Sequence, residues 1–182
     1  MLYNGGMKTF KIENITKDEI NSIKEWTEDS SVIKQYMWGL TDNVVAKKHS
    51  ENLFGLFDKY SSNVKNNKIL YRGMAIPDDL FQAMGYNLLK KGSSYTPDDK
   101  AISSFSVSKK IAYDFAIDGE HKNKVILKIK SHNQDMLDIT NISTVAKEEE
   151  TILTKNIWYN VKHIKKRTVG GVKWLLIILQ KR

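Results

Sequence analysis

Three consecutive glutamates, Glu148, Glu149 and Glu150, run directly into an apolar segment of β type. Side chains alternate between the two faces of a strand, so Glu148 and Glu150 are predicted to point the same way, roughly 7 Å apart. Two neighbouring carboxylates repel each other, which raises the pKa of one and lets the pair divide acid, base and charge-stabilising roles. An acidic strand end exposed to solvent is the alternative interpretation of these residues.

An arginine stands near the end of an earlier apolar segment, in the sequence Ile-Leu-Tyr-Arg-Gly-Met that ends at Met74. The charge of Arg72 cannot be neutralised, so in a partly buried strand it needs an anionic partner. The planar guanidinium suits a phosphate, although a structural salt bridge would satisfy it equally. Gly73 permits a ligand to approach the backbone closely, or simply a turn.

Serines alternate in a third segment, where Ser104 and Ser106 flank Phe105. If this segment is a strand, the two serines share a face and Phe105 enters the core, while Ser108 caps the helix that follows. Serines in this position can orient a neighbouring carboxylate or bind ribose hydroxyls. A polar strand end followed by an N-cap is the alternative.

The elements that must position these residues divide the chain into a helical first third and a strand-rich remainder. Hydrophobic periodicity, a capping box beginning at Thr16 and Pro77 in a first helical turn predict five helices, over 16–26, 31–38, 43–60, 77–89 and 108–116. Short β-type runs predict strands over 8–12, 69–73, 101–106, 124–130, 136–139, 149–153, 159–165 and 172–179. The fold class is therefore α+β. Without a repeat or a Gly/Ser-rich linker, we expect one domain over 1–182, mainly helical over 1–62 and β-rich over 63–182.

Composition excludes several kinds of site. The chain of 182 residues contains no cysteine, which excludes disulfides, cysteine-based zinc sites and a thiol nucleophile. Its four histidines lack metal-ligand spacing, so no metal is expected. The N-terminal residues lack the apolar run of a signal peptide, and the longest late apolar run is too short to span a bilayer. We expect a cytoplasmic protein without a membrane partner.

The formal net charge of +8 is concentrated most strongly between Lys162 and Arg167, with a further basic pair at Lys181 and Arg182. Such a surface favours polyanions, namely nucleic acid, phosphate-rich cofactors or acidic protein surfaces. Lysines that serve solubility alone are the alternative interpretation.

Taken in order, the arginine, Ser-x-Ser and Glu-x-Glu strands resemble the motifs of the mono-ADP-ribosyltransferases of the Arg/Ser-Thr-Ser/Glu-x-Glu class, which includes toxins. In size and layout the chain is most similar to the small single-domain phage enzymes. The resemblance implies an N-terminal helical part packed on a core of two facing, mainly antiparallel sheets. It also implies a phage or bacterial effector that transfers ADP-ribose from NAD to an arginine of a host protein, releasing nicotinamide.

The resemblance also implies a role for each motif residue. Arg72 would hold the NAD phosphates, and the Gly73 backbone would meet the nicotinamide carboxamide. Ser104 would orient Glu150 and support the NAD site together with Ser106. Phe115 stands where toxin-type members present an aromatic ring to nicotinamide. Glu150 would be the catalytic glutamate and Glu148 the one that handles the acceptor, where glutamate rather than glutamine marks arginine-directed transfer.

Two departures from the family pattern concern the NAD site. Phe105 replaces the central threonine of Ser-Thr-Ser. The loop after Phe115 has no arginine for a phosphate, and His121, Lys122 or Lys124 would have to substitute. Three alternatives stay open: an NAD glycohydrolase that transfers to water, a relative of the poly-ADP-ribose and RNA 2′-phosphotransferase enzymes, whose motif begins with histidine where Arg72 stands, and a non-enzymatic nucleic-acid-binding module. In the nucleic-acid-binding module, the basic residues 162–167 would contact RNA. In the enzyme, the same residues would recruit a nucleic-acid-associated target such as ribosomal or transcription machinery.

Overall fold

The computed structural model of the chain describes residues 14–60, 68–97, 100–130, 136–139, 142, 150–153 and 157–182. Contacts divide the chain into two compact units. The helical unit comprises residues 1–66, 98–104 and 132–156, and the sheet unit comprises residues 67–97, 105–131 and 157–182. The strand predicted over residues 8–12 lies outside the described residues. Each unit has its own elements and core.

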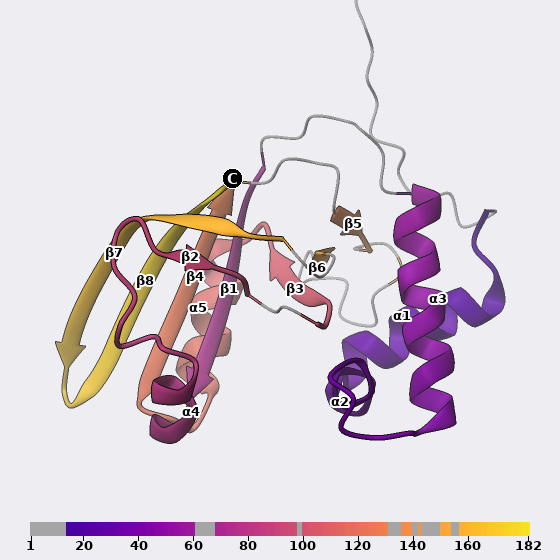
Figure 1. The fold of residues 1–182 in the computed structure, drawn as a ribbon, viewed down its shortest axis with the longest axis horizontal. Coiled ribbons are helices and arrows are strands. Elements are labelled where there is room, and N and C mark those ends of the chain that lie inside the picture. Colours follow the sequence, from indigo (N-terminus) through magenta and orange to yellow (C-terminus); the bar gives the residue numbers. More distant parts are fainter. Residues whose placement is uncertain are drawn as a thin grey trace, which may run out of the picture. The chain divides into compact units, whose positions relative to one another are not determined.

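The helical unit contains α1 (Lys17–Glu28), α2 (Ser31–Met37) and α3 (Val44–Tyr60), all within about two residues of their predicted bounds. It also contains the antiparallel pair β5 (Met136–Asp138) and β6 (Glu150–Leu153), drawn as short arrows in Figure 1. α3 contacts α1, α2 and β5. Within the described ranges, no helix combines the length and apolar character needed to cross a bilayer.

One apolar cluster forms the core of this unit. Its members come from all three helices, from β5 and from the residues just before β3 (Ser103–Ser106). The buried side chains are Ile15, Ile23, Trp26, Ile33, Leu53, Leu56, Phe57, Ile102, Leu137, Ile139 and Ile142. The helical stripe predicted for α3 thus faces a core, and helix packing rather than propensity alone holds these short helices.

The sheet unit is built on the strand order β2-β7-β8-β4-β1-β3. Its strands are β1 (Ile69–Ile76), β2 (Ser94–Tyr95), β4 (Asn123–Lys130), β7 (Tyr159–Val169) and β8 (Val172–Lys181), with Phe105 and Ser106 of β3. β4 and β8 pair in parallel, and the other pairs are antiparallel, so the sheet is mixed. Figure 1 shows β1, β4, β8 and β7 side by side. The α+β class is confirmed.

Two helices accompany this sheet, α4 (Asp78–Ala83) and α5 (Lys109–Asp118). The prediction of a helix over 77–89 is wrong at its C-terminal end. α4 ends at Ala83, six residues earlier than predicted. Gly85 has φ 68°, and the amides of Gly85 and Tyr86 donate to the carbonyls of Gln82 and Phe81, 2.9 and 3.2 Å away. This is a Schellman ending, which a glycine at positive φ makes possible.

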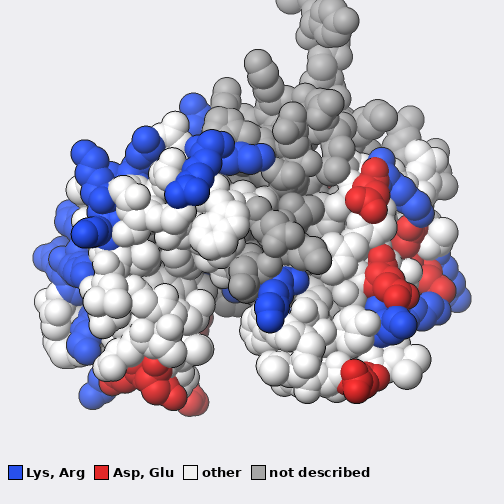
Figure 2. Space-filling model, viewed as in Figure 1, with Lys and Arg blue, Asp and Glu red and all other residues white. Residues whose placement is uncertain are grey.

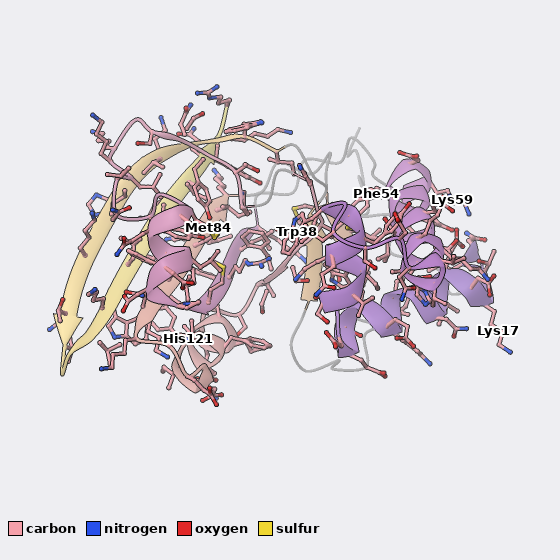
Figure 3. All side chains as sticks on the ribbon, turned by 60° about the horizontal axis from the view of Figure 1, so that its bottom comes forward. Lys17, Trp38, Phe54, Lys59, Met84 and His121 are labelled. Atoms are coloured by element: carbon pink, nitrogen blue, oxygen red, sulfur yellow. The ribbon has the colours of Figure 1, made fainter. Side chains whose placement is uncertain are left out.

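The N-terminus of α1 ties the helical unit together through Glu19, which is 5% exposed. Its carboxylate accepts hydrogen bonds from the backbone amide and hydroxyl of Thr16, 2.8 and 3.0 Å away, and pairs with Lys59 of α3, which Figure 3 labels. Burial alone would raise the pKa of Glu19, but the hydrogen bonds from Lys59 and Thr16 outweigh it and lower the pKa below its usual value.

Because the folded state holds the Glu19 carboxylate at a lowered pKa, its contribution to stability is fully present above the unfolded pKa and is lost as the pH falls through the folded one. We therefore expect the melting temperature to fall below about pH 4.5. The Glu19→Gln variant should lose stability at neutral pH and show a smaller acid-dependent fall. Equal pH profiles for the two proteins, measured by thermal denaturation, would contradict this role.

Candidate functional site

The predicted site residues are distributed over both units. Arg72, Gly73, Ser106 and Phe115 belong to the sheet unit, and Ser104 belongs to the helical unit. The helical unit also contains Glu150, the first residue of β6, whose partner strand is β5. Glu148 and Glu149 lie outside the described residues. The chain passes from one unit to the other between Ser104 and Phe105, within β3.

Arg72 lies half-buried in the middle of β1, beside an aromatic side chain. Its guanidinium carbon is 6.0 Å from the centroid of the Phe105 ring, and its Nε donates to the Met74 sulfur 3.3 Å away. Tyr86 is fully buried, with its hydroxyl 2.9 Å from that of Tyr95. Burial raises the pKa of Tyr86, against the opposing effects of Tyr95 and the charge of Arg72, so the phenol stays neutral. The Phe105 ring thus lies beside a permanent cation that is half-buried.

The register of β1 with β3 decides which side chains share the face of Arg72. Tyr71 stands opposite Ser106, so Arg72 and Phe105 point to one face of the sheet and Tyr71 and Ser106 to the other. Phe105 is 2% exposed, which confirms the prediction that it enters the core. The Oγ of Ser106 accepts a hydrogen bond from the amide of Ser108, 3.0 Å away, and thereby shapes the turn into α5.

Gly73 lies where α5 crosses β1. A Cβ built on Gly73 would stand 1.5 Å from the carbonyl oxygen and 2.6 Å from the carbonyl carbon of Ala112. These are backbone atoms, so no side-chain rotation relieves the clash. The close approach that Gly73 permits is therefore made, on this face, by a helix of the chain itself.

Ser104 is held by the helical part of its own unit. The indole nitrogen of Trp26 on α1 donates to the Ser104 oxygen 2.9 Å away. Indole is a donor only, so Ser104 is the acceptor in this bond and its own proton points elsewhere. Trp26 is 2% exposed, so its ring packs in the core of this unit. The bond to Ser104 spans 78 residues of sequence, and no local pattern signals it.

Two residues near α5 differ in how they fit their predicted roles. Phe115 is 54% exposed, so its ring is available to a ligand. Lys124 was one of three candidates, with His121 and Lys122, to substitute for a phosphate-binding arginine, and its contacts do not fit that role. Its side chain is buried, and its amine donates to the carbonyls of Gly119 and Ile117, 2.6 and 3.3 Å away. Lys124 therefore neutralises the C-terminus of α5, where helix carbonyls favour a cation.

A cavity of about 470 Å³ lies in the helical unit, beside the end of α2 and the middle of α3. Tyr36, Trp38 and Phe54 line it, with Asp42 and Lys100 supplying opposite charges; Figure 3 labels Trp38 and Phe54. Trp38 is 40% exposed, so part of its ring is accessible from this cavity. Among the residues described, no group of three or more His, Asp or Glu side chains is placed to hold a metal ion.

No protein-family model matches the chain, and a comparison with curated protein sequences finds no match. Solved structures do match. The Vis ADP-ribosyltransferase toxin of Vibrio splendidus, in complex with agmatine, has a TM-score of 0.70 at 19% identity, over 96% of this chain and 78% of that one. Plx2a, an ADP-ribosyltransferase toxin from Paenibacillus larvae, has a TM-score of 0.67 at 17% identity, over 93% and 88%.

The chain has an ADP-ribosyltransferase fold. A further similar structure is that of exoenzyme S from Pseudomonas aeruginosa, in complex with human 14-3-3 protein beta and bound to carba-NAD. Its TM-score is 0.67 at 15% identity, over 90% of this chain and 74% of that one. The resemblance drawn from three short motifs is therefore confirmed for the fold. Within the ADP-ribosyltransferase fold of this chain, the arginine and serine motifs fall on β1 and β3, and Glu150 is the first residue of β6.

Proposed function

We propose that the protein is an NAD-dependent mono-ADP-ribosyltransferase that modifies an arginine of a target protein and releases nicotinamide. The observation that carries the proposal is that the Arg72, Ser104 and Glu150 motifs begin or occupy strands of an ADP-ribosyltransferase fold, in the family's order. We infer the rest of the family architecture with it: one catalytic domain over 1–182, with N-terminal helices packed on two facing, mainly antiparallel sheets.

The side chains of the candidate site suit NAD as the co-substrate. Arg72, half-buried beside the Phe105 ring, offers a planar fork for phosphate oxygens. We assign the backbone of Gly73 and the ring of Phe115 to the nicotinamide end, and Ser104 and Ser106 to the support of the site. Exoenzyme S, bound to carba-NAD in its structure, shows that this fold accommodates such a ligand in another protein.

The reaction breaks the bond between the nicotinamide nitrogen and the ribose carbon, and the bonding electrons leave with nicotinamide. The ribose carbon becomes an oxocarbenium-like centre, which the carboxylate of Glu150 stabilises. A guanidinium nitrogen of the acceptor then attacks that carbon, and the proton it releases passes to Glu148. The products are ADP-ribosyl-arginine, nicotinamide and one proton.

An arginine acceptor is supported by two observations. The first of the paired glutamates is Glu148 rather than a glutamine. In addition, the structurally similar Vis toxin binds agmatine, which carries the same guanidinium group as arginine. The neighbours Vis and Plx2a are bacterial toxins, which supports an effector of bacterial or phage origin acting in the cytoplasm of a host cell. The basic residues 162–167 favour a nucleic-acid-associated target.

The proposal is tested by incubating the protein with NAD labelled in its adenosine part and a bacterial lysate. Label on one or a few protein bands, with ADP-ribose mapped to an arginine by mass spectrometry, is the expected result. Label only in free ADP-ribose would make the chain an NAD glycohydrolase. If neither nicotinamide nor ADP-ribose were released, with or without lysate, the result would contradict the proposal that the chain is an enzyme acting on NAD.

Trp26 is expected to act as a positioning residue for Ser104. The Trp26→Phe variant keeps an aromatic ring in the core but removes the N–H that fixes the hydroxyl. We expect kcat for nicotinamide release to fall by roughly fivefold, the worth of one hydrogen bond, while KM for NAD changes little. In the Ser104→Ala background, Trp26→Phe should cost no further activity, because the two residues act through one bond. Additive losses in the double variant would assign Trp26 to packing alone.

A further inference from the structure

The net charge of the chain comes almost entirely from its C-terminal segment. The whole sequence has 29 Lys and Arg residues and 21 Asp and Glu residues. Residues 157–182, which form β7 and β8, contain seven of these basic residues and none of the acidic ones. The rest of the chain is thus nearly neutral. Figure 2 shows the basic side chains gathered on the part of the sheet unit where β7 and β8 lie.

β7 presents this charge on an edge of the sheet. Its pairing with β2 covers only Tyr159 and Asn160, and among the described residues its longer pairing is with β8 alone. Lys165 and Arg167 are both exposed. A lysine or two is enough to protect an edge strand from aggregation. A run of 26 residues without one carboxylate goes beyond that need.

The register places a row of aromatic and basic side chains on one face. Arg167 stands opposite Trp174 of β8, and the Trp174 ring stacks on Tyr113 of α5, with centroids 5.9 Å apart and planes 19° apart. The amine of Lys109 lies 5.3 Å from the centroid of the Tyr113 ring. Two stacked rings are therefore flanked by a cation at each end. This row lies on the sheet face opposite to Arg72, since Gly73 packs against α5 and shares the face of Trp174.

More cations border this row. Lys165 stands opposite Leu176 of β8, two residues along β7 from Arg167, and so points to the same face roughly 7 Å away. Lys128 of β4 stands opposite Ile178 of β8, which places it on this face as well. The result is a cationic surface with half-buried aromatic rings in its middle.

We propose that this surface, formed by Lys109, Tyr113, Lys128, Lys165, Arg167 and Trp174, binds single-stranded nucleic acid. The cations contact the phosphodiester backbone, and a base stacks on the aromatic pair. Protein–protein interfaces are depleted of lysine, whereas nucleic-acid interfaces are strongly positive, so the composition favours nucleic acid over an acidic protein. The inference does not depend on the proposed transferase activity.

The experiment measures fluorescence anisotropy of end-labelled 20-nucleotide RNA and DNA strands with the full chain over a range of salt concentrations. The Lys165→Gln/Arg167→Gln variant should bind roughly tenfold more weakly, and its log–log salt slope should fall by about 1.4, because two phosphate contacts are lost. The matched control is Lys17→Gln/Lys24→Gln on α1, which removes the same charge from exposed positions of the helical unit. Equal losses in both double variants would overturn the site.

The aromatic part needs a separate variant. Tyr113→Leu should weaken oligonucleotide binding roughly tenfold while leaving binding of heparin, a polyanion without bases, within twofold. Equal weakening for both ligands would contradict base stacking, and tighter binding to acidic peptides or anionic vesicles than to oligonucleotides would overturn the proposal. Nicotinamide release without nucleic acid should be unchanged in all these variants, which separates this site from the transferase. The ratio of RNA to DNA affinity identifies the preferred strand.

Discussion

The Glu150→Gln variant is expected to lose nicotinamide release and protein labelling by roughly a thousandfold, with the melting temperature little changed. Glutamine has nearly the shape of glutamate but no charge, so it cannot stabilise the oxocarbenium-like ribose; loss of one such preorganised group costs about 10²–10³ in rate. Nicotinamide release, followed by liquid chromatography, reports bond cleavage independently of any acceptor. Full transfer by Glu150→Gln would remove the assignment.

Two neighbouring glutamates provide matched controls within the same run. Glu148→Gln is expected to lose transfer to protein but to keep part of the NAD hydrolysis, because cleavage needs Glu150 whereas attack by the acceptor needs Glu148. Glu149→Gln removes the same charge, but strand alternation predicts that its side chain points to the opposite face, so activity should change less than twofold. Three equal losses would show that the acidic run acts through its total charge.

Local patterns in the sequence predicted most of the elements. The capping box at Thr16 predicted the start of α1, and the alternation around Phe105 predicted its burial. β7 proved longer than predicted, reaching Val169, because an exposed edge strand lacks hydrophobic alternation. Pairing with β8 holds it in place, and that pairing is a tertiary effect.

The candidate site was predictable only as residue types. The arginine and serine motifs could be read from the chain, but their immediate partners could not. Phe105 beside Arg72 and Trp26 beside Ser104 are distant in sequence from the residues they contact. Lys124 shows that sequence can also suggest a ligand contact that the structure uses for packing. This lysine follows the loop where the family binds phosphate, but its amine donates to the carbonyl of Gly119 at the end of α5.

Gly73 is the position where packing and ligand binding are most easily confused, and one substitution separates them. Gly73→Ala is expected to destabilise the fold by about 3 kcal/mol, since the new methyl group would meet backbone atoms of Ala112 and push α5 away from β1. The measurement is the free energy of unfolding in urea.

Gly55→Ala is the matched control for this change. Gly55 lies in α3, a Cβ there would meet nothing within 4 Å, and alanine favours a helix, so the variant should gain about 0.5–1 kcal/mol. If Gly73→Ala kept the wild-type stability but lost NAD affinity, the glycine would be required for the ligand alone. A loss of about 3 kcal/mol would instead show that Gly73 is needed first for packing α5 against β1. Any contact of Gly73 with nicotinamide would then use a backbone that α5 already holds in place.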